Sequence, residues 1–193
     1  METDAVAVAA AVIRDCVATQ TALLDEPQLE SIVLAANALA DCLARGGKLL
    51  FFGNGGSASD AGHLAAEFVG RFQSERRGLP ALSLAANVSA LTAIANDFGF
   101  ERVFARQVEA LGGPADVAIA ISTGGTSANV LAGVQAAREI GMRTVGLTGA
   151  GGGKLAAMVD VCVRVPARSA ARIQESHILI GHVLCELVEC DLA

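Results

Sequence analysis

The chain has 193 residues, of which 53% are hydrophobic and 18% charged, a composition that excludes intrinsic disorder and allows one domain with a sizeable core. Its formal net charge is −6, Trp and Tyr are absent, and no basic run exceeds Arg76-Arg77, so we expect no broad nucleic-acid-binding face. So low a charge density predicts that other subunits cover part of the apolar surface.

The first 46 residues predict two helices and no strand. Ala5–Leu24 and Leu29–Arg45 carry apolar residues at three- and four-residue spacing. Asp25-Glu26-Pro27 separates the two segments, and Gly46-Gly47 ends the second. We therefore expect a helical hairpin over residues 1–46 whose apolar surface serves oligomerisation.

The apolar stretch nearest the start of the chain predicts no membrane segment. Ala5–Ile13 is too short to span a bilayer. Glu2 and Asp4 precede it, where a signal peptide would carry basic residues. We therefore expect a cytoplasmic protein without a membrane partner.

From residue 47 to residue 193 the pattern predicts alternating strands and helices. Five short apolar runs are each followed by glycines or a turn and then, in most cases, by a helical stretch: Lys48–Phe52, Ala81–Leu84, Val117–Ile121, Thr144–Leu147 and Val161–Val165. We expect the last helix to run from about Ala170 to the C-terminus. The alternation predicts a single α/β domain, a doubly wound five-stranded parallel sheet with helices on both faces. Ligands of such sheets bind beyond the carboxyl ends of the strands.

The cysteines predict neither a disulfide framework nor a cysteine-zinc site. They are five in number, widely spaced, without a CxxC pair, and lie among small apolar residues: Cys16, Cys42, Cys162, Cys185 and Cys190. We expect them to be small buried hydrophobic residues in a reducing compartment.

Two glycine- and hydroxyl-rich loops follow predicted strands. Gly53-Asn54-Gly55-Gly56-Ser57 has the strand–glycine–helix order that lets backbone N–H groups close on an anion, although a simple tight turn with Ser57 as helix cap is equally compatible. Ser122-Thr123-Gly124-Gly125-Thr126-Ser127 offers several hydroxyls at another helix start, but no lysine, so neutral donors would bind the anion. Two such loops at one edge of a sheet favour a phosphorylated polar ligand.

A candidate acid–base group lies on the helix after the first loop. His63 and Glu67 are four residues apart and therefore share a helical face. Burying Glu67 in its apolar surroundings requires a partner or a proton, which makes it a candidate for proton transfer. A histidine alone on an apolar helix, such as His177, is more often a structural residue, and we expect His177 to be one.

These motifs resemble the phosphoheptose isomerase (sedoheptulose 7-phosphate isomerase) family of the sugar-isomerase (SIS) domain superfamily. The resemblance covers nearly the whole chain and rests on four motifs in order: Gly53-Asn54-Gly55-Gly56-Ser57-Ala58 through His63 and Glu67, Leu91–Asp97, Ile121-Ser122-Thr123, and Arg172-Ile173-Gln174-Glu175 with His182. It implies an SIS-type fold and a cytoplasmic homotetramer with active sites between subunits. It also implies conversion of sedoheptulose 7-phosphate to D-glycero-D-manno-heptose 7-phosphate, the first step of ADP-heptose synthesis for lipopolysaccharide core or other heptose-containing glycans.

The resemblance also implies a role for each site residue. Glu67 and His182 would be the acid–base pair, with either assignment of base and acid open. The residues matching the substrate site are Asn54, Gly55, Gly56, Ser57, Glu67, Asn96, Asp97, Ser122, Thr123, Gly124, Ser127 and Gln174. Some members bind zinc, and the matching ligands are His63, Glu67, Gln174 and His182. Gln174 and His182 are separated by about 12 Å of helical rise, which makes a common ion difficult without a helix irregularity, long reach or a neighbouring subunit.

Two positions depart from the family pattern, and other functions remain open. Many members have a third serine where Gly124 stands, and some have an aspartate where Ala171 stands. The main alternative is a non-catalytic relative, either a sugar-phosphate sensor or an adaptor of the replication initiator, and a second is an isomerase of a different sugar phosphate. Because the chain retains both Glu67 and His182, the enzyme is favoured.

Overall fold

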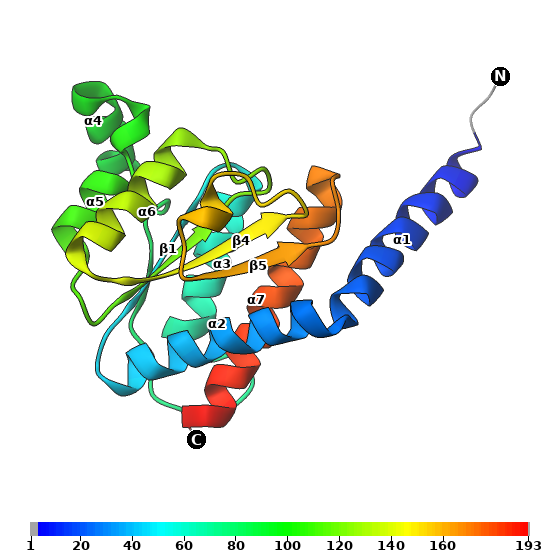
Figure 1. Ribbon diagram of the computed structural model, residues 1–193, viewed down its shortest axis with the longest axis horizontal. Helices are drawn as coiled ribbons and strands as arrows, with labels where there is room; N and C mark the ends of the chain where they lie inside the picture. The colour runs from blue at the N-terminus through cyan, green and yellow to red at the C-terminus, as the bar shows by residue number, and fades with distance from the viewer. Residues whose placement is uncertain (1–3, 193) are drawn as a thin grey trace.

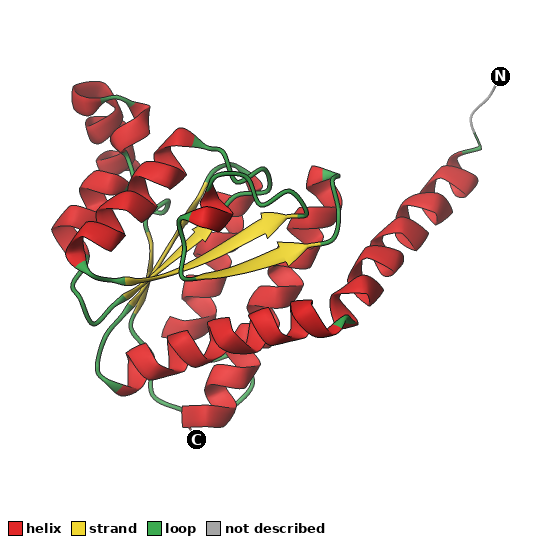
Figure 2. Cartoon of the chain, in the orientation of Figure 1, coloured by secondary structure: helices red, strands yellow, loops and turns green. Residues whose placement is uncertain are grey.

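The computed structural model describes residues 4–192. Its centre is a parallel sheet of five strands in the order β2-β1-β3-β4-β5, drawn as arrows in Figure 2. The strands are β1 (Leu49–Gly53), β2 (Ala81–Ser83), β3 (Val117–Ile121), β4 (Arg143–Gly149) and β5 (Val161–Val165). The α-helices are α1 (Ala5–Thr21), α2 (Glu26–Ala44), α3 (Gly56–Val69), α4 (Val88–Phe98), α5 (Ala105–Leu111), α6 (Ala128–Ile140) and α7 (Ala170–Leu192). The predicted sheet is confirmed.

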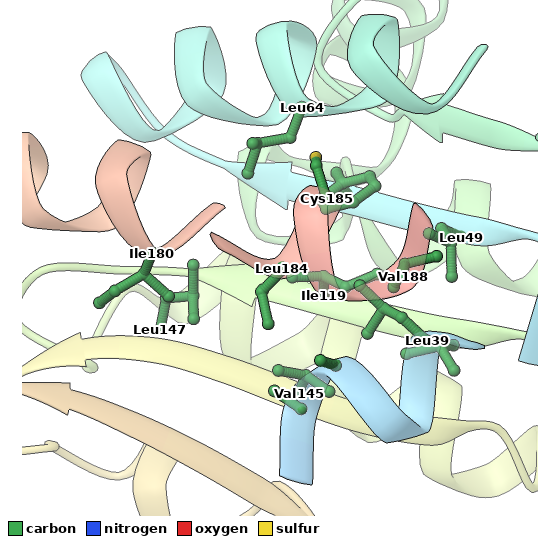
Figure 3. Close-up of a cluster of buried hydrophobic side chains, with 14 of the residues drawn as sticks. Leu39, Leu49, Leu64, Ile119, Val145, Leu147, Ile180, Leu184, Cys185 and Val188 are labelled. Carbon is green, nitrogen blue, oxygen red and sulfur yellow. The ribbon is translucent and has the colours of Figure 1, made fainter. Parts of the chain in front are cut away.

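Alternate residues of each central strand face two separate hydrophobic cores, because successive side chains of a strand point to opposite faces. Leu49 and Phe51 of β1 belong to the core under α2, α3 and α7, and Leu50 and Phe52 belong to the core under α5 and α6. Figure 3 shows part of the first core, where side chains from α2, α3, three strands and α7 meet. A sheet buried on both faces explains why the strands read as continuous apolar runs.

The strand order sets the position of a binding site. From β1 the chain moves to β2 on one side and then returns to β3 on the other side of β1. The connections therefore diverge between β1 and β3, and ligands of open α/β sheets bind at this switch point, beyond the carboxyl ends. The two loops singled out from the sequence are the ones that follow β1 and β3.

The predicted N-terminal hairpin is wrong, although both of its helices form. A short 3-10 turn (Ala22–Leu24) joins α1 to α2, and α1 extends away from the body rather than folding back along α2 (Figure 1). Pro27 lies in the first turn of α2, where a proline is tolerated because its missing N–H would have no partner within the helix. The helix α1 contacts α7 instead: the Nη1 of Arg172 donates to the Val12 carbonyl over 2.8 Å.

Helix α1 presents an apolar surface to solvent, and only Thr19 in it is buried. Its exposed large apolar side chains are Val6, Val8, Val12, Ile13 and Val17. By length and composition Ala5–Leu24 could cross a membrane, and it is longer than the apolar stretch that the sequence analysis considered. However, Arg14 and Asp15 interrupt it near the middle, where charged side chains are expensive in lipid.

The cysteine prediction is confirmed in part. Cys42 and Cys185 are buried, whereas Cys16 and Cys162 are half-buried and Cys190 is exposed. Cys190 lies in the last turn of α7, on the side away from Val188 and the core. All five cysteines are free thiols.

The loop after α3 is held by a buried ion pair. The Glu189 carboxylate of α7 accepts hydrogen bonds from the backbone N–H groups of Phe72, Gln73 and Ser74 and from Arg76 Nε at 2.8–3.0 Å. Burial would raise the pKa of Glu189, but these donors outweigh it and lower the pKa to about 2. The Nη2 of Arg76 also donates to the Glu67 carbonyl over 2.9 Å, so the pair ties this loop to the end of α3.

His177 is completely buried in α7, which confirms its structural assignment. Neither ring nitrogen forms a well-aligned hydrogen bond within residues 4–192. Burial lowers the pKa of His177 from 6.5 to about 4, opposed in part by a polar contact with the Thr148 backbone.

The free energy of unfolding is expected to fall by about 3 kcal/mol as the pH drops from 6.5 to 4 through His177 alone. The unfolded imidazole takes up a proton near pH 6.5, whereas the folded one stays neutral until about pH 4, so stability is complete above 6.5. Urea denaturation across this range, in the wild type and in His177→Leu, measures the effect as the difference between the two curves. Equal pH dependence of both proteins would contradict it.

Candidate active site

The first loop connects β1 to α3 and places polar groups at the switch point. The N-cap of α3 is Gly55, which has no side chain, so the alternative in which Ser57 caps the helix is wrong. Ser57 lies instead in the first turn and is 3% exposed. A Cβ on Gly56 would stand 2.6 Å from the Gln174 Nε2, so a larger residue there would displace the Gln174 side chain of α7 from this loop.

The second loop connects β3 to α6 and leaves a helix start open for an anion. Ser127 is the N-cap residue of α6 but makes no capping hydrogen bond. Its hydroxyl instead lies 3.4 Å from the Oγ of Ser122, which is almost buried. The first N–H groups of a helix without a side-chain cap, next to two hydroxyls, are a suitable site for a phosphate.

A pair of asparagines joins the two loops. The amides of Asn54 and Asn129 exchange two hydrogen bonds of 2.8 Å. Asn129 is 3% exposed and stands in the first turn of α6. Asn129 was not among the predicted site residues, although a polar residue shortly after the hydroxyl-rich loop was a signal for it. The pair holds the loops in a defined mutual position.

The predicted acid–base residues come together on the surface formed by α3 and α7. His63 Nε2 lies 3.1 Å from the Glu67 Oε1 and 3.3 Å from the His182 Nε2. The His63 side chain is 47% exposed and that of Glu67 25% exposed, so Glu67 is less buried than the sequence suggested. The rings of His63 and Phe72 flank the His182 ring at centroid distances of 5.1 and 5.2 Å.

These three side chains suit a zinc ion. Their potential ligand atoms all lie within 4.8 Å of one another. Ligands about 2.0–2.2 Å from a tetrahedral zinc stand about 3.3–3.6 Å apart, close to the distances between the His63, Glu67 and His182 atoms. Two imidazoles and a carboxylate also form a known type of catalytic zinc site that leaves a position open for a further ligand.

A further carboxylate, that of Asp60, lies on α3 about one turn before His63, outside the cluster of His63, Glu67 and His182. Its Oδ2 is buried and has no hydrogen-bond partner within residues 4–192. Burial raises the pKa of the Asp60 carboxyl, and the charge of a protonated His63 opposes the shift.

Two groups of predicted residues lie apart from these three side chains. Gln174 stands against Gly56, at the other end of the α3–α7 contact, and α7 is continuous between Gln174 and His182. The role of Gln174 as a metal ligand stays a prediction.

Asn96 and Asp97 lie on α4, which has no buried residue, and Asn96 donates to Asp97 over 2.8 Å. Figure 1 shows α4 far from the carboxyl ends of β4 and β5.

The fold is an open parallel α/β sheet with two phosphate-type loops at its switch point, and a comparison with known families gives its class. A family model described as SIS domain matches residues 4–149. The chain therefore belongs to the SIS domain family.

Within that family the chain belongs to the phosphoheptose isomerases. It is 59% identical over 167 residues to a phosphoheptose isomerase of Roseiflexus sp. (strain RS-1), covering 86% of this chain and 85% of the relative. It is 54% identical over 159 residues to that of Rhodospirillum rubrum, covering 82% and 85%.

Solved structures agree with this assignment. The structure of phosphoheptose isomerase GmhA from Neisseria gonorrhoeae is similar with a TM-score of 0.89 and 44% identity, over 94% of this chain and 97% of that one. A phosphoheptose isomerase from Francisella tularensis gives a TM-score of 0.92 and 35% identity, over 97% and 100%.

Proposed function

We propose that this chain converts sedoheptulose 7-phosphate to D-glycero-D-manno-heptose 7-phosphate, the first step of ADP-heptose synthesis. The observation that carries the proposal is the contact of His63, Glu67 and His182 in a chain that also has two phosphate-type loops. Relatives named phosphoheptose isomerase support the choice of sugar. A non-catalytic sensor or adaptor is not favoured, because it would need no such cluster.

The substrate phosphate would be held by hydroxyls and N–H groups of both loops. Ser57, Ser122, Thr123 and Ser127 supply the hydroxyls, and the open start of α6 supplies N–H donors. Asn54, Gly55, Gly56 and Gln174 line the same edge and would contact the sugar chain.

The isomerisation moves one carbon-bound proton and one oxygen-bound proton. A base removes a proton from C1 of the ketose, which gives an enediolate, and the proton is returned to C2. A hydroxyl proton leaves O1, and O2 gains one, so the carbonyl passes from C2 to C1. We assign the carbon proton to Glu67 and the oxygen protons to His182, because a carboxylate and an imidazole within 4.8 Å of each other can divide these roles.

His63, Glu67 and His182 would hold zinc, with Gln174 as the fourth ligand implied by the resemblance. Bound there, zinc would supply Lewis-acid polarisation of the carbonyl group.

We further propose a cytoplasmic homotetramer whose active sites lie between subunits. The exposed apolar face of α1 supports assembly with other copies. The position of Asn96 and Asp97 on α4, a helix without a buried residue, supports a site completed by a neighbour. Glu67 also stands eleven residues after Gly56 on α3, about 16 Å of helical rise from its own first loop. Five free thiols suit a reducing compartment.

Turnover of sedoheptulose 7-phosphate by the purified full chain tests the proposal. We expect a chelator to abolish turnover and zinc to restore it, whereas magnesium should not restore it, because it prefers oxygen ligands. Turnover that persists after the metal is removed would contradict the zinc site but not the isomerase. No turnover even with zinc would contradict the isomerase.

A further inference from the structure

A cavity of about 350 Å³ lies beside the second loop, at the carboxyl ends of β3, β4 and β5. Most of its wall lies outside the residues predicted for the substrate and metal sites, and this wall includes the glycine-rich segment after β4. The lining residues are Thr123, Gly124, Gly149, Ala150, Gly151, Gly152, Ala167, Arg168 and Ile173.

The glycine-rich segment is packed directly against the second loop. The Gly149 N–H donates to the Thr123 carbonyl over 2.9 Å. Gly125 has a φ of +62°, and a Cβ there would overlap the Gly152 carbonyl oxygen. A Cβ on Gly149 would likewise stand 2.5 Å from the Ile173 side chain. The cavity is therefore continuous with the second loop, and the close packing leaves no room for side chains at Gly125 and Gly149.

Arg168 is the only charged residue among those that line the cavity. It stands in the loop between β5 and α7, is exposed, and forms no ion pair with any residue of 4–192. Ile173, near the start of α7, also lines the cavity, so the positive end of that helix dipole lies close by. A cavity with a guanidinium, a helix start and no carboxylate in its lining favours an anion.

The second loop itself offers no cation, because its six residues carry hydroxyls and glycines only. A sugar phosphate is a dianion, and a guanidinium binds two of its oxygens at once through parallel N–H donors. We propose that Arg168 is a substrate-binding residue that contacts the phosphate of the sugar from the side of the cavity, an inference that rests on the proposed function. Arg168 thereby supplies the positive charge that Ser122–Ser127 lacks.

The test compares Arg168→Ala and Arg168→Lys with the wild-type chain. Losing a charge-assisted hydrogen bond weakens binding by about tenfold to a hundredfold. We expect Arg168→Ala to raise the KM for sedoheptulose 7-phosphate and the inhibition constant of inorganic phosphate by a similar factor in that range. Lysine keeps the charge but not the two parallel donors, so Arg168→Lys should give intermediate values.

Arg143→Ala is the matched control, because Arg143 begins β4 at the amino end of the strand, opposite the cavity, and is also exposed. Its KM and phosphate inhibition should equal those of the wild type. Values within twofold of wild type for Arg168→Ala would overturn the proposal, and an equal loss in Arg143→Ala would overturn it as a general charge effect. If the wild type shows no turnover, the proposed function is contradicted, and the role of Arg168 is then tested by calorimetric binding of inorganic phosphate. Weaker phosphate binding to Arg168→Ala than to the wild type supports the role of Arg168, and equal binding overturns it.

Discussion

Replacing Glu67 by Gln is expected to lower kcat for sedoheptulose 7-phosphate by about 10³-fold, since a positioned acid–base group contributes about 10²–10⁴-fold. The amide keeps the size of the side chain but cannot accept the proton from C1. Glu67 contacts His63 directly, so the change also removes one charged oxygen from the candidate metal site. Steady-state turnover at saturating zinc measures the effect.

Two measurements accompany this variant. The exposed Glu139 of α6 provides the control, because Glu139→Gln removes a carboxylate far from His63 and should leave kcat unchanged. The zinc content of Glu67→Gln separates proton transfer from metal binding: retained zinc with lost turnover identifies the carboxylate as the base. Near-normal turnover would contradict the role of Glu67 altogether.

Replacing Glu189 by Ala is expected to lower the free energy of unfolding by about 3–5 kcal/mol, the usual effect of breaking a buried ion pair. The Glu189 and Arg76 side chains are only 4% and 12% exposed. Without the carboxylate, the Arg76 Nε and three backbone N–H groups lose their acceptor, and the guanidinium charge loses its partner, in a site that water hardly reaches. Urea denaturation at pH 7 measures the loss.

Glu75→Ala is the control for this measurement, because it removes a carboxylate from the same loop. The Glu75 side chain is 87% exposed, and its ion pair with Arg71 spans 3.5 Å, so the expected change is below about 1 kcal/mol. The Glu189 contribution also depends on pH. Because the folded pKa of Glu189 is lowered to about 2 from 4.5, its contribution is complete above pH 4.5 and is lost as the pH falls toward 2. Equal stability of Glu189→Ala and Glu75→Ala would contradict the assignment.

Short-range patterns in the chain predicted the sheet almost completely. β3 and β5 have the predicted bounds, and β1 is shifted by a single residue. Such agreement is expected because strands buried on both faces must be apolar throughout and must end in turns. The i, i+4 relation of His63 and Glu67 was equally local, since one helix is enough to bring them together.

The prediction of an N-terminal hairpin was wrong because local patterns carry no information about the tertiary contacts that orient α1. The apolar periodicity of Ala5–Leu24 predicts a helix but does not say what covers it. The direction of α1 depends on α7, where Arg172 binds the Val12 carbonyl across 160 residues of sequence. The same limit holds for Asn96 and Asp97, whose placement on the exposed α4 follows from tertiary packing.

By itself, the sequence determined an α/β domain with two anion-type loops and the neighbouring His63 and Glu67 on one helix, because periodicity and turn chemistry act over a few residues. Only the tertiary structure decided which distant groups meet. It brought His182 to His63 across 119 residues, joined Asn54 to Asn129, and placed Arg168 in the cavity beside Thr123. These contacts depend on the strand order and on the packing of parallel helices α3 and α7, which no local pattern encodes.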